Sequence, residues 1–276
     1  MEIIFGGLSS LFFGVADFLG GEGARRASAP SIVLWAGVVS YPVIVITAVV
    51  VGGDAAISDY LIGLLAGSSG AIGLVALFAG LSRARAAVVA PVAAALSAVI
   101  PVIAGVIQGE RPSQLAWTGV AIGIPAIVLC AWVEGGQQAR GGGFGYGALA
   151  GLGFGGFAVI IDQTNPDSNL LPLVSSRAAA MLVMLVVGMA GGWALAGFRK
   201  VPRKIVLGNG LFDVSGSVAL LLALRQGSLA LAAVAASFYP AITVLLAKVL
   251  NAEHLRMRQI VGIALTLLAL ALIALG

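Results

Sequence analysis

The chain has 276 residues, of which 60% are hydrophobic and 9% are charged, with a formal net charge of +4 at pH 7 and a mean hydropathy of +1.10. Soluble domains carry about 45–50% apolar and about 25% charged residues, so this composition predicts an integral membrane protein. Long apolar runs separated by short charged breaks favour helical spans over barrel strands. The basic residues flank these runs, where membrane orientation explains them, and nucleic acid is therefore excluded as a partner.

The apolar runs predict an all-α, polytopic membrane protein with ten transmembrane helices. In chain order the predicted spans are 3–21, 31–51, 60–81, 86–107, 115–133, 144–162, 170–196, 205–224, 229–250 and 257–275. The first run lacks a basic start, so we interpret it as a retained span and not as a cleaved signal. The chain then divides into a first five-helix repeat (1–133), a linker (134–143) and a second five-helix repeat (144–276).

Both halves contain a related stretch. The segment Leu81–Ala131 recurs 143 residues later, with Glu110 matching Glu253 and Gly119 matching Gly262. An odd number of spans in each half turns the second half over in the membrane, so homologous halves form inverted repeats, as is common in secondary transporters. We expect the two matched glutamates to be structural.

The distribution of lysine and arginine predicts an orientation. Twelve of the fifteen basic residues follow odd-numbered spans, and the other three are Arg111, Arg177 and Arg225. By the positive-inside rule the odd-numbered breaks are cytoplasmic. Both termini are therefore expected on the periplasmic side of a bacterial inner membrane.

Proline and glycine are also placed within the spans. Proline inside a helix removes a backbone hydrogen bond and tends to kink it. Glycine at small-xxx-small spacing lets two helices approach closely, as predicted for Gly63 with Gly67 and for Gly151 with Gly155. The prolines within predicted spans are Pro42, Pro91, Pro101, Pro125 and Pro240.

Catalytic chemistry has little support. The single histidine, His254, and the single cysteine, Cys130, leave no histidine-based triad and no His/Cys metal cluster. We therefore expect no enzyme and no metal. An intramembrane enzyme built on paired aspartates stays an alternative, because Asp17, Asp162 and Asp213 lie near or within apolar runs, although no catalytic spacing links them.

Asp213 is the clearest polar candidate. It lies within the span 205–224, between Asn209 and Ser217 at i, i+4, i+8 spacing, so all three share one helix face that should point to a cavity and not to lipid. An ionisable residue inside a membrane is a functional candidate by default. Asp213 could bind substrate or a proton, or it could be a structural acid paired with a neighbouring helix.

A similar stripe of Ser9, Phe13 and Asp17 lies in the first span. Asp17 is a second candidate for proton coupling. Because it is close to the predicted cytoplasmic end of the span, the sequence favours a solvated carboxylate or one paired with Arg25.

The two halves share an apolar span with proline, a short acidic break and a glycine-bearing final span. This pattern resembles the EamA type of the drug/metabolite transporter superfamily, most closely its YddG-type exporters of aromatic amino acids, over essentially the whole chain. Ala252 departs from the Gly-Glu of the family pattern. The residues that carry the resemblance are Pro101, Gly109, Glu110 and Gly119 in the first half and Pro240, Ala252, Glu253 and Gly262 in the second.

The resemblance implies inverted repeats around a central cavity formed largely by helices 1, 3, 4, 6, 8 and 9. It implies no cofactor and export of small amphipathic metabolites across the inner membrane. As inward-facing positions it implies a substrate site formed by Ser9, Phe13, Phe78, Phe154, Phe157, Asp213, Ser217, Ser237 and Tyr239.

We therefore expect a monomer in the lipid bilayer that exports aromatic or other neutral amino acids by alternating access. A multidrug or other metabolite exporter of the same superfamily is an alternative, and so is a passive facilitator or channel. The few charges near or inside the spans argue against highly charged phosphorylated substrates.

Overall fold

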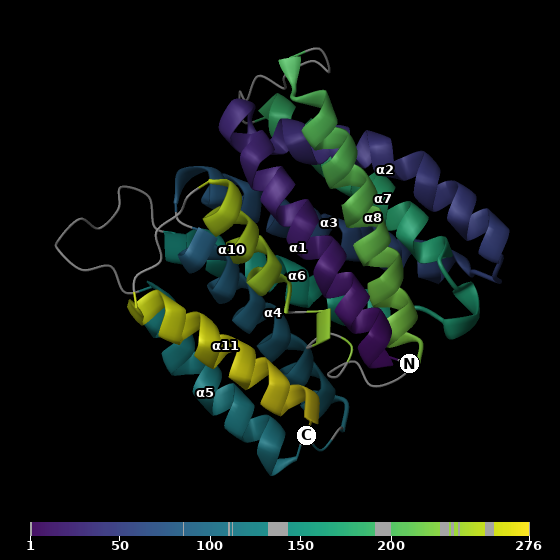
Figure 1. The fold of residues 1–276 in the computed structure, drawn as a ribbon. Coiled ribbons are helices and arrows are strands. Elements are labelled where there is room, and N and C mark those ends of the chain that lie inside the picture. The colour runs from purple at the N-terminus through teal and green to yellow at the C-terminus, as the bar shows by residue number, and fades with distance from the viewer. Residues whose placement is uncertain are drawn as a thin grey trace.

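The computed structural model describes residues 2–84, 86–109, 111, 113–131, 143–190, 200–226, 232, 235–236, 238–251 and 257–275. Within these ranges the chain forms helices and no strands (Figure 1). The α-helices are α1 (Glu2–Arg26), α2 (Ala29–Val51), α3 (Ile57–Arg83), α4 (Ala86–Ile107), α5 (Gln114–Ala131), α6 (Gly143–Asp162), α7 (Leu171–Ala190), α8 (Arg203–Leu224), α10 (Tyr239–Leu250) and α11 (Met257–Leu275), and a short 3-10 helix, η1, covers Pro166–Ser168.

Six of the described helices are long and apolar enough to cross a membrane, namely α1, α2, α3, α4, α6 and α8. α7, α10 and α11 contain shorter apolar stretches. Large hydrophobic side chains such as Ile46, Val50 and Leu65 are exposed on the outside of the bundle, as a surface facing lipid allows. The predicted all-α fold with several membrane spans is confirmed to this extent.

The helix bounds follow the predicted spans closely, with two differences. α1 continues to Arg26, five residues past the predicted end at 21. Within the predicted span 229–250, α10 begins at Tyr239, and before it the described residues 232, 235 and 236 are also helical. The linker 134–143 lies almost wholly outside the described residues, as do Glu110 and Glu253, for which the expected structural roles stay predictions.

Two helix pairs form the centre of the bundle, since α1 packs along α8 and α3 packs along α6. α4 packs against α6, and α7 lies against both α2 and α3. α5 and α11 pair with each other at one side of the bundle, where they also contact α4 (Figure 1). The centre of the bundle is thus built from helices of both halves of the chain.

The predicted glycine pairs mark close helix contacts. A Cβ on Gly67 of α3 would lie 2.0 Å from the carbonyl oxygen of Ser176 in α7. A Cβ on Gly151 of α6 would lie 2.6 Å from the carbonyl oxygen of Ala93 in α4. Because a side chain at either position would collide with backbone, these approaches require glycine.

Four of the predicted prolines, Pro42, Pro91, Pro101 and Pro125, lie inside helices. Pro240 does not, because it lies in the first turn of α10. Its missing N–H is no loss there, since the first N–H groups of a helix have no partner within the helix. Pro240 thus lies at the start of a helix and not inside one, unlike the other four prolines.

One end of the bundle is held by a polar cluster. Arg225, directly after α8, donates to the carbonyl oxygen and to Oγ1 of Thr164 at 2.9 and 2.7 Å and to Oγ of Ser168 at 3.3 Å. Asp59, at the start of α3, accepts from the backbone N–H of Asn165 at 2.8 Å. Burial lowers the pKa of the Arg225 guanidinium, and nearby carboxylates partly offset that by raising it. We call these five residues the end cluster.

Candidate functional site

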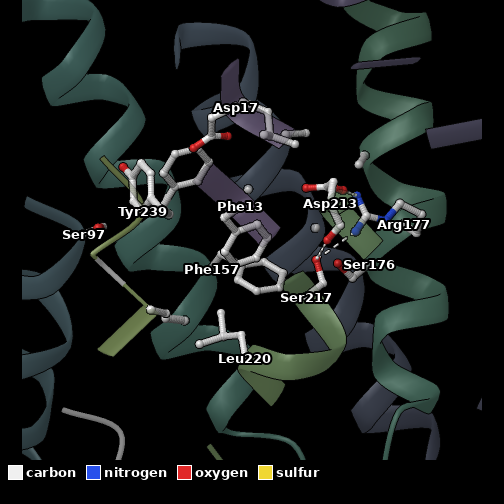
Figure 2. Close-up of a pocket in the computed structure, with 18 residues that line it drawn as sticks. Phe13, Asp17, Ser97, Phe157, Ser176, Arg177, Asp213, Ser217, Leu220 and Tyr239 are labelled. Carbon is white, nitrogen blue, oxygen red and sulfur yellow. Dashed lines mark hydrogen bonds and ion pairs between the residues drawn. The ribbon is translucent and has the colours of Figure 1, made fainter. Parts of the chain in front are cut away.

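A cavity of about 100 Å³ lies inside the bundle, with room for several water molecules and hence for a small solute. Its walls come from α1, α3, α4, α6, α7, α8 and the start of α10 (Figure 2). Most of the lining is apolar. The polar and charged side chains that line it are Asp17, Ser97, Ser176, Arg177, Asp213 and Ser217.

The polar part of the cavity is organised by an ion pair between Arg177 of α7 and Asp213 of α8. Nη2 of the same arginine donates to Oγ of Ser217 at 3.0 Å, and this hydroxyl donates to the carbonyl oxygen of Asp213 at 2.9 Å. The two charged side chains are only 12% and 10% exposed. A buried charge requires such pairing, because removal from water is otherwise costly.

The predicted face of α8 is therefore correct for Asp213 and Ser217, which both line the cavity. Asn209, one turn earlier, instead donates from Nδ2 to the carbonyl oxygen of Ala16 at 2.6 Å and ties α8 to α1. The same helix stripe thus serves the cavity at two positions and helix packing at the third.

Arg177 is the main residue that sequence reasoning missed. The charge count treated it as a basic residue outside the spans, although it lies well inside the predicted span 170–196. A lone arginine in such a run needs a carboxylate partner, and this signal could have identified it. The close contact of Gly67 with α7 at Ser176 brings this part of α7 against α3 beside the cavity. α7 therefore forms part of the cavity wall, in addition to the six helices that the family resemblance implied.

Asp17 of α1 lines the cavity and is only 4% exposed. It is neither solvated nor paired with Arg25, whose closest acidic partner is Glu22 at 4.0 Å. The favoured reading from sequence is thus wrong, because α1 continues more than two turns beyond this aspartate. Among the described residues, no hydrogen bond or ion pair to the Asp17 carboxylate is found.

Aromatic rings form much of the apolar wall. Four of the aromatic residues in the predicted site line the cavity, namely Phe13, Phe154, Phe157 and Tyr239. The rings of Phe154 and Tyr239 meet edge to face, with centroids 6.4 Å apart and an interplanar angle of 89°. This geometry is favoured between aromatic rings and fixes part of the wall.

Two predicted site residues lie elsewhere. Ser9 is fully buried and donates to the carbonyl oxygen of Gly216 at 2.9 Å, joining α1 to α8. Phe78 packs against Gly20, where any Cβ would collide with its ring. Neither side chain lines the cavity. Ser237 lies outside the described residues.

The fold and this site together define a polytopic helical membrane protein with an internal, mainly apolar cavity that contains an ion pair. Residues 142–275 match the model of the EamA-like transporter family. The second half of the chain is thus similar to an EamA-like transporter domain.

No curated protein matches the sequence. Fifteen chains of solved structures match it. One of them, a crystal structure whose description names no function, aligns with a TM-score of 0.69 and 14% identity over 99% of this chain and 96% of its own. At this identity the similarity shows the fold alone.

Proposed function

We propose that this protein is a secondary transporter that exports small amphipathic metabolites, with aromatic or other neutral amino acids as the substrates, by alternating access. The observation that carries the proposal is the internal cavity, in which aromatic walls surround a few polar groups. A site for an amphipathic solute has this composition, because apolar walls hold the body and a few polar groups orient it.

The arrangement of the helices supports alternating access between two inverted repeats. If α1 to α5 correspond in order to α6, α7, α8, α10 and α11, the pairing of α1 with α8 has its counterpart in the pairing of α6 with α3. Since α5 corresponds to α11, exchanging the two halves leaves the pairing of α5 with α11 unchanged. Halves related in this way can rock about a shared midplane site.

The proposal includes a place in the membrane. We expect a monomer in the inner membrane of a bacterium, with both termini in the periplasm, as the Lys and Arg bias predicts. A C-terminal fusion to a reporter that works only in the periplasm should be active. Activity of a reporter that works only in the cytoplasm would show the opposite orientation.

Transport itself is tested by counterflow in proteoliposomes. Vesicles loaded with unlabelled phenylalanine should accumulate labelled aromatic amino acids transiently above equilibrium, with a rate that saturates. A screen of other neutral amino acids would then define the substrate range. Flux that never saturates and shows no counterflow would instead support a passive channel.

Proton coupling has two candidate residues in the cavity. Asp213 is compensated by Arg177, whereas Asp17 faces Asp213 and Tyr239 without a cationic partner among the described residues. Asp17 is therefore the stronger candidate, because an uncompensated buried carboxylate favours uptake of a proton or a cation. Transport driven by a pH gradient should be lost in Asp17→Asn, and Asp213→Asn is compared in the same assay. Unchanged pH dependence in both variants would remove proton coupling from the proposal.

A further inference from the structure

The charges of the cavity do not balance. Three strongly ionisable side chains line it, and two of them, Arg177 and Asp213, neutralise each other. Both terminal nitrogens of the arginine are occupied, one by the Asp213 carboxylate and the other by the Ser217 hydroxyl. When both acids are ionised, the described lining therefore carries one net negative charge, which belongs to Asp17.

Asp17 can meet a ligand directly. Its carboxylate lies at the cavity surface, above the Phe13 ring in the view of Figure 2, while the ion pair lies to one side. The Tyr239 hydroxyl is buried, and the Ser97 side chain lies beside it. A ligand cation at this position would meet a carboxylate and the faces of aromatic rings, and both attract positive charge.

The opposite charge has no comparable site. A solute carboxylate would have to take Arg177 from Asp213 and would leave that acid unpaired in the cavity, which is costly. It would also be repelled by Asp17. A carboxylate is therefore not what the cavity selects.

We propose that Asp17 binds the ammonium group of the transported solute, so that the substrates of this cavity are small amines with an apolar or aromatic body, whether or not they also carry a carboxylate. The inference rests on the proposed transport function and makes it more specific. The ammonium lies at Asp17, and the hydrocarbon part lies among Phe13, Phe154 and Phe157. Amino acids bind through their amino group, and the corresponding carboxylic acids without an amine are excluded.

Three probes of almost equal size separate these requirements, namely phenethylamine, phenylalanine and 3-phenylpropionate. Binding is measured as ligand-dependent thermal stabilisation of the full-length protein in detergent, without any need for transport. Phenethylamine and phenylalanine should stabilise the wild type, and 3-phenylpropionate should not. Stabilisation by the acid equal to that by the amine would overturn the proposal, and so would the absence of any shift with the amine.

The carboxylate is tested by Asp17→Asn, with Asp167→Asn, in the exposed turn before α7, as the matched control. Loss of one charge-assisted hydrogen bond should weaken phenethylamine binding by about tenfold or more in the first variant and leave it unchanged in the control. Amine affinity within about twofold of wild type in Asp17→Asn would contradict the proposal. If this variant does not fold, the comparison of the three probes on wild-type protein decides whether the cavity binds the ammonium group. If the amine binds but no counterflow is observed, the proposed transport function is rejected and the amine-binding site is still supported.

Discussion

Two partly buried arginines of this protein are held in different ways. Arg177 lies in the cavity and is neutralised by the Asp213 carboxylate, whereas Arg225 lies in the end cluster and donates to the neutral oxygens of Thr164 and Ser168. At the end of a helix, backbone and hydroxyl acceptors are within reach and water is near. In the middle of the bundle only a carboxylate balances the charge. The two sites should therefore respond differently to the loss of a partner.

The largest effect is expected for Asp213→Ala. The substitution leaves the Arg177 guanidinium buried without its carboxylate, which should reduce the free energy of unfolding by about 3–5 kcal/mol. Thermal or denaturant unfolding of the purified protein in detergent measures the change. The double variant Arg177→Met/Asp213→Leu should recover most of the loss, because it removes both charges together. A loss below about 1 kcal/mol in the single variant would show that the pair is not a buried one.

Next comes Gly67→Ala, which tests the helix contact beside the pair. The new Cβ would lie 2.0 Å from the carbonyl oxygen of Ser176, and backbone cannot move aside as a flexible side chain can. We expect a loss of about 3 kcal/mol in the same unfolding assay, at the upper end of the range for overpacking. Gly7→Ala is the matched control, because a Cβ there meets nothing within 4 Å. Equal stability of the two variants would contradict the close packing of α3 on α7.

The smallest of the three effects is expected for Arg225→Gln. This variant loses the hydrogen bonds to the neutral oxygens of Thr164 and Ser168, so the cost should be about 2 kcal/mol. Arg111→Gln, at an exposed position, should change stability by less than about 0.5 kcal/mol. If Arg225→Gln lowers the free energy of unfolding as much as Asp213→Ala does, the expected difference between the two sites is contradicted.

The helices could be predicted well from the sequence, because runs of apolar residues between charged breaks set their ends. The face of α8 could also be predicted, since Asp213 and Ser217 are polar residues at helical spacing in an apolar run. In an almost wholly apolar helix no such periodicity exists. For Phe78 only the family resemblance implied a place in the cavity, whereas its ring packs against Gly20.

Long-range pairing was harder to predict than helix ends. The partnership of Arg177 with Asp213 joins residues of α7 and α8 that are 36 positions apart, and no local pattern shows which helices face each other. Asp17 was misjudged for a different reason. Asp17 is close to the end of the predicted first span at residue 21, and this nearness suggests exposure. The helix α1 extends to Arg26, however, and the aspartate lies deep in the bundle.

The central claim, that the solute crosses the membrane through this cavity, is tested most directly by narrowing it. Gly70 lines the cavity, and a Cβ there would lie 3.2 Å from the Phe157 ring, so Gly70→Leu should occupy the solute's place. Gly7→Leu, which projects from the exposed side of α1, is the control. In proteoliposome counterflow of labelled phenylalanine, we predict accumulation above equilibrium by the wild type and by Gly7→Leu and at least a tenfold lower rate for Gly70→Leu at equal protein content. Accumulation by Gly70→Leu equal to that of the wild type would contradict the claim.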